Sequence, residues 1–229
     1  MHPAGGEIRG FPLKAQNSVD DQLKWETRPE NTLINLNCMP IAKIVGIDEV
    51  GRGCLFGPVV AAAVILNESQ VQSLWDAGLR DSKRLSPAQR LVLDQRIRAE
   101  TDQWRLGLAS VLEIDRLNIL QAALLAMKRA VLKFNPLPTE CWIDGNKSIP
   151  GLNLPQKTIV GGDNSCPSIA AASILAKVWR DQLMERLALR YPGYGIERHK
   201  GYGTLQHRAA LQTLGHTPLH RRSFRVRSV

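Results

Sequence analysis

The chain alternates short apolar runs with longer stretches in which apolar residues recur at helical spacing. Runs of strand length, rich in β-branched residues, lie at residues 43–50, 58–66, 104–111, 141–144 and 157–160. Helical patterns lie at residues 86–99, 117–134, 168–190 and 204–214. The first two strands are close enough in sequence to pair as an antiparallel hairpin. Because strands and helices are interleaved, the pattern predicts an α/β domain with a mixed β-sheet flanked by helices.

Two helix ends carry specific signals. Ser86 followed by Pro87 and Gln89 is typical of a capped helix start, and Gly215 is placed to end the last helix. Residues 1–40 lack such periodicity and are rich in Gly, Pro and polar residues. We therefore predict two parts, a mobile or weakly docked N-terminal extension at 1–40 and a compact domain at 41–229.

The chain is strongly basic, with 30 Lys and Arg against 21 Asp and Glu, a net charge of +9 and a pI of about 9.7. After Glu197 there is no acidic residue, and that tail holds four of the five histidines and seven basic residues: Arg198, Lys200, Arg208, Arg221, Arg222, Arg225 and Arg227. Such a segment favours a polyanionic partner, above all nucleic acid. A solvated basic surface explains the charge alone equally well.

The cysteine pattern and the lack of targeting signals indicate a cytoplasmic protein. No two of the four cysteines have C-x-x-C spacing, which argues against a zinc site and favours buried, reduced thiols. No segment is apolar enough over sufficient length to span a membrane, and the N-terminus lacks the apolar core of a secretory signal.

Carboxylates follow or interrupt three of the predicted strands. Asp48 and Glu49 lie within the first, and Asp144 and Asp163 follow two later ones. Adjacent strand residues face opposite sides, so Asp48 and Glu49 could both reach one ion only if a bulge or turn at the following glycines redirects one of them. A single Asp at a strand end is usually a turn former, but the set of four predicts a Mg²⁺ or Mn²⁺ site. Such a site suits phosphodiester hydrolysis with two metal ions.

Seven motifs, in this order along residues 41–225, resemble those of the bacterial ribonuclease HII family. They are residues 46–53 (GIDEVGRG), 57–64 (GPVVAAAV), 81–86 (DSKRLS), 143–146 (IDGN), 171–178 (AASILAKV), 199–202 (HKGY) and 220–224 (HRRSF). The resemblance implies a ribonuclease H-like fold and cleavage of RNA in RNA–DNA hybrids. It also implies incision on the 5′ side of single ribonucleotides in duplex DNA, leaving 3′-hydroxyl and 5′-phosphate ends, by a monomeric enzyme.

The resemblance also implies roles for individual residues. Metal binding and catalysis fall to Asp48, Glu49, Asp144 and Asp163. The substrate contacts that it implies are Gly51, Arg52 and Gly53 at the ribose 2′-hydroxyl, Tyr202 at the neighbouring deoxyribose, Ser82 and Lys83 at phosphates, and Lys200.

Each assignment has a structural alternative. Arg52 could simply pair with Glu49, Tyr202 could be a core aromatic, and Lys83 could be a solvated surface residue. We expect Lys177 to be structural and Asp181 to lie on a helix surface. Gly161 stands where the family usually has a lysine, so one cation near the site is missing.

Two other functions remain open from the sequence. One is a ribonuclease HIII-like nuclease that cuts hybrids but is poor at single ribonucleotides. The other is a nucleic-acid binding module that has lost catalysis. The position of Asp163 and the lack of a substantial N-terminal substrate-binding domain argue against the first, and the presence of all four carboxylates argues against the second.

Overall fold

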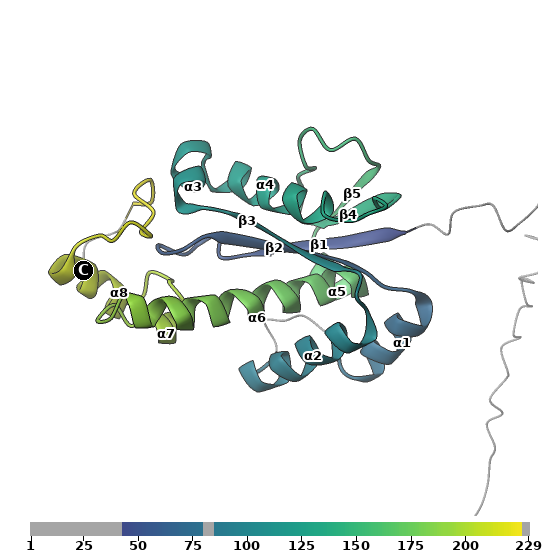
Figure 1. Cartoon of the computed structure of the whole chain (residues 1–229), viewed down its shortest axis with the longest axis horizontal. Helices are drawn as coiled ribbons and strands as arrows, with labels where there is room; N and C mark the ends of the chain where they lie inside the picture. The colour runs from purple at the N-terminus through teal and green to yellow at the C-terminus, as the bar shows by residue number, and fades with distance from the viewer. Residues whose placement is uncertain (1–42, 80–84, 226–229) are drawn as a thin grey trace, which may run out of the picture. The chain divides into compact units, whose positions relative to one another are not determined.

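A computed structural model of the chain describes residues 43–79 and 85–225 (Figure 1). The predicted N-terminal extension at 1–40, the predicted phosphate contacts Ser82 and Lys83, and Cys38 lie outside the described residues. Within these ranges, no helix combines the length and apolar character needed to cross a membrane.

One mixed sheet forms the centre of the domain, with strand order β3-β2-β1-β4-β5. The strands are β1 (Ile44–Val50), β2 (Val59–Ile65), β3 (Trp104–Ala109), β4 (Glu140–Asp144) and β5 (Gln156–Ile159). β1 pairs antiparallel with β2 and parallel with β4. The predicted hairpin of the first two strands and the predicted mixed sheet are thus confirmed.

Helices cover both faces of this sheet. In the described ranges they are α1 (Glu68–Asp76), α2 (Pro87–Glu100), α3 (Val111–Leu117), α4 (Ile119–Val131), α5 (Gly162–Ser165), α6 (Pro167–Arg190), α7 (Ile196–His199) and α8 (Leu205–Leu214). Figure 1 shows α4 on one face of the sheet and α6 with α2 on the other. The predicted cap of α2 is present, since Ser86 and Gln89 form a reciprocal capping box.

Alternation along the strands divides the apolar residues between two cores. Val45 and Ile47 of β1 are fully buried on the side of α4. Ala62 and Val64 of β2 are fully buried on the side of α6. A third cluster, around Phe56, joins the loop after β1 to the end of α6 and to the C-terminal helices. This third cluster places the C-terminal part of the chain next to the loop that follows β1.

The predicted helix at 117–134 is present as α4, which is shorter at both ends and runs from Ile119 to Val131. A separate helix that the sequence pattern did not predict, α3, ends just before it, and Asn118, with a φ of 71°, separates the two. Asn tolerates the left-handed region better than most residues, and its side chain accepts a hydrogen bond from the Gln121 amide at 3.1 Å to start α4. Apolar spacing continues across the break, so periodicity alone does not reveal it.

Two glycines let the main helices approach the sheet closely. A Cβ atom on Gly46 of β1 would collide with the backbone of Ser168 and Ile169 at the start of α6. A Cβ atom on Gly107 of β3 would collide with backbone atoms of Ala126 and Ala130 in α4. The close approach at Gly46 brings α6 directly against β1, the strand that carries Asp48.

We predict that Gly107→Ala lowers the free energy of unfolding by about 1–3 kcal/mol, because the added methyl group meets helix backbone that cannot rotate away. Urea unfolding monitored by circular dichroism measures this change. Leu189→Ala, at a side chain that is 85% exposed, is the control and should stay within about 0.5 kcal/mol of wild type. Equal unfolding midpoints for Gly107→Ala and wild type would contradict the close packing.

Candidate active site

Parallel pairing of β1 with β4 brings two of the predicted carboxylates together. Ile47 pairs with Ile143, so Asp48 and Asp144 follow at neighbouring strand positions. Asp48, Glu49 and Asp144 all line one pocket of about 300 Å³. The structure therefore gathers three of the four predicted carboxylates at one edge of the sheet.

Of the bulge or turn expected at the glycines after Glu49, the structure has a turn, in which Gly51 has a φ of 92°. The β1–β2 ladder continues in regular register through Asp48↔Ala62, Glu49↔Ala61 and Val50↔Val60. Glu49 also lines a second pocket of about 260 Å³ on the α4 side, together with Leu120 and Met127. Both carboxylates reach the first pocket because it lies at the end of β1, where residues from either face are accessible.

Asp48 is buried and its carboxyl group is held in a strongly unfavourable environment for charge. Burial, followed by the negative charges of Glu49 and Asp144, raises its pKa well above the usual value. Hydrogen bonds from the Ser173 hydroxyl and from the Glu49 amide, the latter at 2.7 Å, oppose that shift. A positive ion in the pocket would reduce the electrostatic repulsion between these carboxylates.

Arg52 partly neutralises Glu49. Its Nη1 lies 3.0 Å from Glu49 Oε1, and its own side chain is about half exposed. Burial still raises the pKa of Glu49, although the Arg52 charge lowers it. The ion pair considered from the sequence is thus present, while Arg52 also lines the pocket.

Asp163 lies beside the group of carboxylates but does not line the pocket. It is buried in α5, where its Oδ1 accepts a hydrogen bond from Asn164 Nδ2 at 3.0 Å. Its neighbour Gly162 donates its backbone N–H to Asp144 Oδ1 at 2.8 Å. The structure therefore links Asp163 to the site through the backbone of α5 and does not place its side chain on the wall.

The donor set fits a hard divalent cation in its chemistry. The pocket offers carboxylate oxygens and no thiolate or imidazole, which matches the preference of Mg²⁺ and Mn²⁺. In the described ranges, however, no three His, Cys, Asp or Glu side chains already have the arrangement of a metal-binding cluster. The fit therefore rests on the three carboxylates that line the pocket, those of Asp48, Glu49 and Asp144, and on the raised pKa values of Asp48 and Glu49.

The Gly-Arg-Gly turn forms another wall and is supported from behind by two buried arginines. Gly51 has a φ of 92°, and a Cβ atom there would collide with the Arg180 guanidinium. Arg221 donates from Nη2 to the Gly51 carbonyl at 2.7 Å and from Nη1 to the Arg52 carbonyl at 2.8 Å. Sequence reasoning gave neither arginine a role at the site, because Arg221 belongs to the basic C-terminal stretch and Arg180 lies within the helical pattern at 168–190.

Tyr202 closes the turn from the opposite side. It is 40% exposed, which excludes the core-aromatic alternative, and it pairs with Cys54 in an isolated β-bridge. A Cβ atom built on Gly53 would lie 3.9 Å from Tyr202 Cε1, so the ring sits over the turn. The predicted turn and the predicted aromatic therefore share one pocket.

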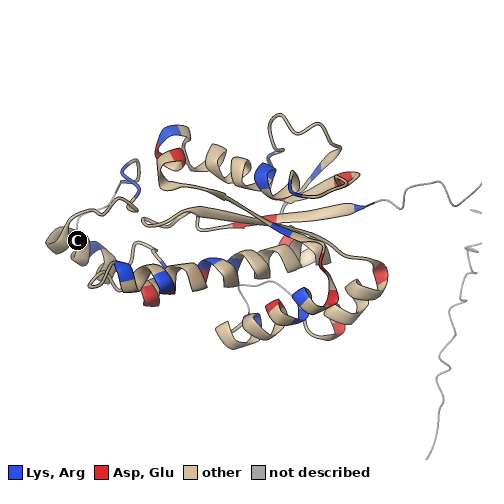
Figure 2. Cartoon of the chain, in the orientation of Figure 1, with Lys and Arg blue, Asp and Glu red and all other residues tan. Residues whose placement is uncertain are grey.

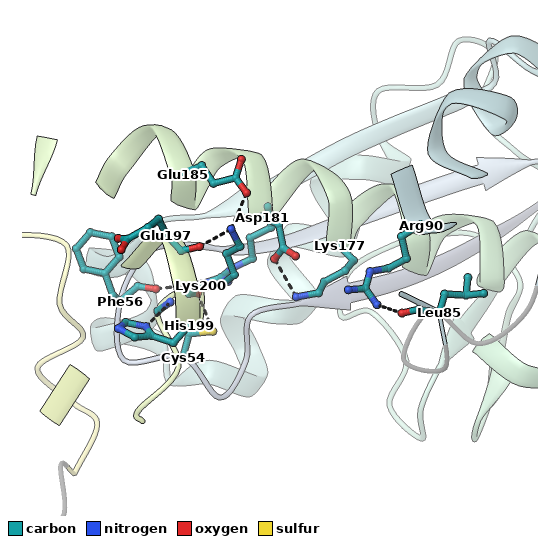
Figure 3. Close-up of polar contacts among 12 residues, drawn as sticks. Cys54, Phe56, Leu85, Arg90, Lys177, Asp181, Glu185, Glu197, His199 and Lys200 are labelled. Atoms are coloured by element: carbon teal, nitrogen blue, oxygen red, sulfur yellow. Dashed lines mark hydrogen bonds and ion pairs between the residues drawn. The ribbon is translucent and has the colours of Figure 1, made fainter. Parts of the chain in front are cut away.

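Basic side chains differ from the sequence predictions in their placement. Basic and acidic positions lie side by side along α6 (Figure 2). Lys177, expected to be structural, lines the pocket while its Nζ lies 2.8 Å from Asp181 Oδ1 (Figure 3). Arg90 of α2, which the sequence did not single out, lines the pocket too.

Lys200 is absent from the pocket wall. Its Nζ instead contacts Glu185 Oε1 at 2.6 Å and the Glu197 carbonyl at 2.7 Å (Figure 3).

Comparisons with known proteins agree on one family. The ribonuclease HII family model matches residues 45–227. The ribonuclease HII of Acaryochloris marina is 59% identical over 182 residues, covering 80% of this chain and 92% of the relative. The RNase HII in the PCNA:RNase HII complex from Archaeoglobus fulgidus has a TM-score of 0.69 at 26% identity, covering 82% of this chain and 97% of that one. Bst-RNase HIII in complex with Mn²⁺ shares only the fold, at 19% identity and a TM-score of 0.58, covering 76% and 63%.

We predict that Asp48→Asn stabilises the metal-free protein at neutral pH. A carboxyl group with a raised pKa binds its proton more tightly in the folded than in the unfolded chain. Its protonated form therefore contributes fully to folding stability below the unfolded pKa of about 4, and this contribution is lost as the pH rises through the folded pKa. At pH 7.5 the variant should be more stable by about 1 kcal/mol or more, and the difference should shrink toward pH 4.

Urea unfolding with EDTA across this pH range measures the effect. Asp76→Asn, at an exposed position of α1, is the matched control and should follow wild type at every pH. An Asp48→Asn protein less stable than wild type at pH 7.5 would contradict the electrostatic account of the pocket.

Proposed function

The chain belongs to the ribonuclease HII family, and from this premise we propose how its pocket acts. The protein is an endoribonuclease that hydrolyses RNA in RNA–DNA hybrids, and incision on the 5′ side of a single ribonucleotide in duplex DNA is typical of the family. The observation that carries the proposal is one pocket with two kinds of wall. The carboxylates of buried Asp48 and of partly buried Glu49 and Asp144 form one wall, and the Gly-Arg-Gly turn with Tyr202 forms the other.

Asp48, Glu49 and Asp144 would hold Mg²⁺ or Mn²⁺, and metal binding by Asp163 remains a prediction from the sequence. A bound pair of such ions would activate a water for in-line attack and stabilise the leaving oxygen, the chemistry that leaves 3′-hydroxyl and 5′-phosphate ends. The protein contributes a concentrated negative charge at the end of β1, kept from water on the α6 side. Ser173 orients Asp48 through its hydroxyl group.

The other wall selects the sugar. Glycines at 51 and 53 leave the backbone of the turn bare, so its amides can approach a ribose 2′-hydroxyl, the group that separates RNA from DNA at one position. Tyr202 is placed to pack against the neighbouring deoxyribose. Lys177 and Arg90 add positive charge to the same pocket and are suited to a phosphate. Contacts from Ser82, Lys83 and Lys200 remain predictions from the sequence.

No observation favours the alternative functions over this one. The matching family model is ribonuclease HII, and the likeness to ribonuclease HIII extends only to the fold. A binding module without catalysis would not need a buried Asp48 with Glu49 and Asp144 beside it, because burial and the negative charges of these neighbours raise the pKa of Asp48 and disfavour its charged form. A monomeric state and a cytoplasmic location remain predictions from the sequence.

We predict one metal-dependent cut on the 5′ side of the ribonucleotide when a labelled DNA duplex carrying a single ribonucleotide is incubated with Mg²⁺ or Mn²⁺. An all-DNA duplex should stay intact, and a chelator should stop the reaction. Asp144→Asn should reduce cleavage by roughly 10³-fold or more, because it removes a charged oxygen at the reacting centre, while duplex binding persists.

Two outcomes would count against parts of this proposal. Cleavage of a long RNA–DNA hybrid without any cut at the single ribonucleotide would withdraw the role of Gly51, Arg52 and Gly53. Undiminished turnover by Asp144→Asn would withdraw the site itself.

We also predict that Mn²⁺ raises the thermal stability of the wild type in the absence of substrate. Saturation to about 100 times the dissociation constant adds about 2.7 kcal/mol, because only the folded chain gathers the three carboxylates. Asp144→Asn should lose most of this gain, whereas Asp76→Asn on α1 should keep it. Equal stabilisation of both variants, measured by differential scanning fluorimetry, would argue that the ion binds elsewhere.

A further inference from the structure

A segment near the C-terminus contacts the Gly51–Gly53 turn directly and is linked to Tyr202 through His207. We call residues 216–221 the C-terminal segment. It runs beside the loop after β1, with hydrogen bonds from the Arg221 amide to the Leu55 carbonyl at 2.9 Å and from the Gly57 amide to the Leu219 carbonyl at 2.8 Å. His220 and Phe56 form an isolated β-bridge between the two stretches. Residues separated by more than 160 positions are thereby joined.

Arg221 uses its whole guanidinium group on the backbone of that loop. Its side chain is essentially buried, and Nε donates to the Gly57 carbonyl at 3.0 Å while the two terminal nitrogens reach the carbonyls of Gly51 and Arg52. Burial lowers its pKa only to about 10, so it is charged at neutral pH and keeps all its donors. A lysine has one ammonium group and cannot reproduce this fork.

These contacts determine which way the turn presents its amides. In a trans peptide the N–H points opposite to the C=O of the preceding residue. Because Arg221 draws the carbonyls of Gly51 and Arg52 toward itself, the N–H groups of Arg52 and Gly53 point away from it. Arg221 is behind the turn and does not line the pocket, whereas all three turn residues do. The two amides are thus presented on the pocket side.

Two hydrogen-bonded histidines, His220 and His207, contact the backbone of Tyr202. The Thr217 amide donates to His220 Nδ1 at 2.9 Å, so the neutral His220 ring carries its proton on Nε2. That Nε2 lies 3.1 Å from His207 Nε2, so His207 Nε2 accepts the hydrogen bond. His207 therefore carries its proton on Nδ1 and donates it to the Tyr202 carbonyl at 2.9 Å. Every donor in this series of hydrogen bonds has an acceptor, and its end fixes the backbone that carries the Tyr202 ring.

We propose that the C-terminal segment is a positioning element for ribose recognition. Arg221 orients the amides of the Gly51–Gly53 turn, and His220 acts through His207 to set the position of Tyr202. Neither residue touches substrate. The inference rests on the proposed function of that turn and of Tyr202. It extends that function by naming the residues that position the turn and Tyr202 relative to each other.

The test compares two quantities for each variant. The first is the single-turnover rate of incision at a single ribonucleotide in duplex DNA. The second, measured in an Asp144→Asn background, is the ratio of affinities for that duplex and for an all-DNA duplex of the same sequence. A residue that only supports the fold changes stability without changing this ratio in the folded protein.

We predict that Arg221→Lys lowers the incision rate by about 10- to 100-fold, because the turn amides lose their orientation, and moves the affinity ratio toward one. Arg222→Gln removes a charge from the exposed neighbouring position. It should weaken binding of both duplexes alike and leave their ratio unchanged. A folded Arg221→Lys protein with the wild-type ratio would overturn the role of Arg221.

The His207 variants test the second arm and do not depend on the folding of Arg221→Lys. His207→Asn retains a donor for the Tyr202 carbonyl at the position of Nδ1 and loses only the acceptor for His220 Nε2. It should therefore keep more of the wild-type ratio than His207→Leu, which loses both contacts. Equal ratios for these two variants would overturn the proposal. If the wild type itself showed no preference for the ribonucleotide, the proposed function would fail and not only the role of the C-terminal segment. The wild-type affinity ratio therefore distinguishes the two failures.

Discussion

The parallel pairing of β1 with β4 is the constraint on which the rest of this site depends. It places Asp48 beside Asp144 at one edge of the sheet, and Gly46 allows α6 to pack against the same strand and bring Ser173 to Asp48. The result is negative charge in a place that burial disfavours. A fold arranged only for stability would avoid such a group, so the arrangement is best understood as a site prepared for a cation.

Buried positive charge lies behind the Gly51–Gly53 turn, on the other side of the pocket from the carboxylates. Arg180 and Arg221 are both buried and both donate to backbone carbonyls, Arg180 to those of Phe56, Pro58 and Lys200. Backbone carbonyls cannot move independently of the chain, so these bonds determine the course of the loop. A rigid turn with exposed amides is what selective recognition of one hydroxyl group requires.

Stability and function oppose each other at Asp48 and agree at Arg221. Removing the charge of Asp48 relieves repulsion among carboxylates, yet it removes the oxygen proposed to hold the metal. Removing Arg221 leaves buried carbonyls without donors and also releases the turn. Substitutions at the two positions therefore separate the part of the pocket proposed to carry out the chemistry from the part proposed to recognise the sugar.

Local pattern determined much of this protein from the sequence alone. Alternation and apolar runs predicted the strands, and Ser86 and Pro87 predicted the start of α2, because each depends on neighbours within a few residues. The carboxylates in or after three strands indicated a metal site, and the family resemblance supplied the roles of the individual residues. Only the tertiary structure decided that Arg221 and His207 are buried, that Lys177 and Arg90 line the pocket, and that the side chain of Asp163 does not. Those outcomes depend on contacts between residues far apart in the chain, and local periodicity carries no information about them.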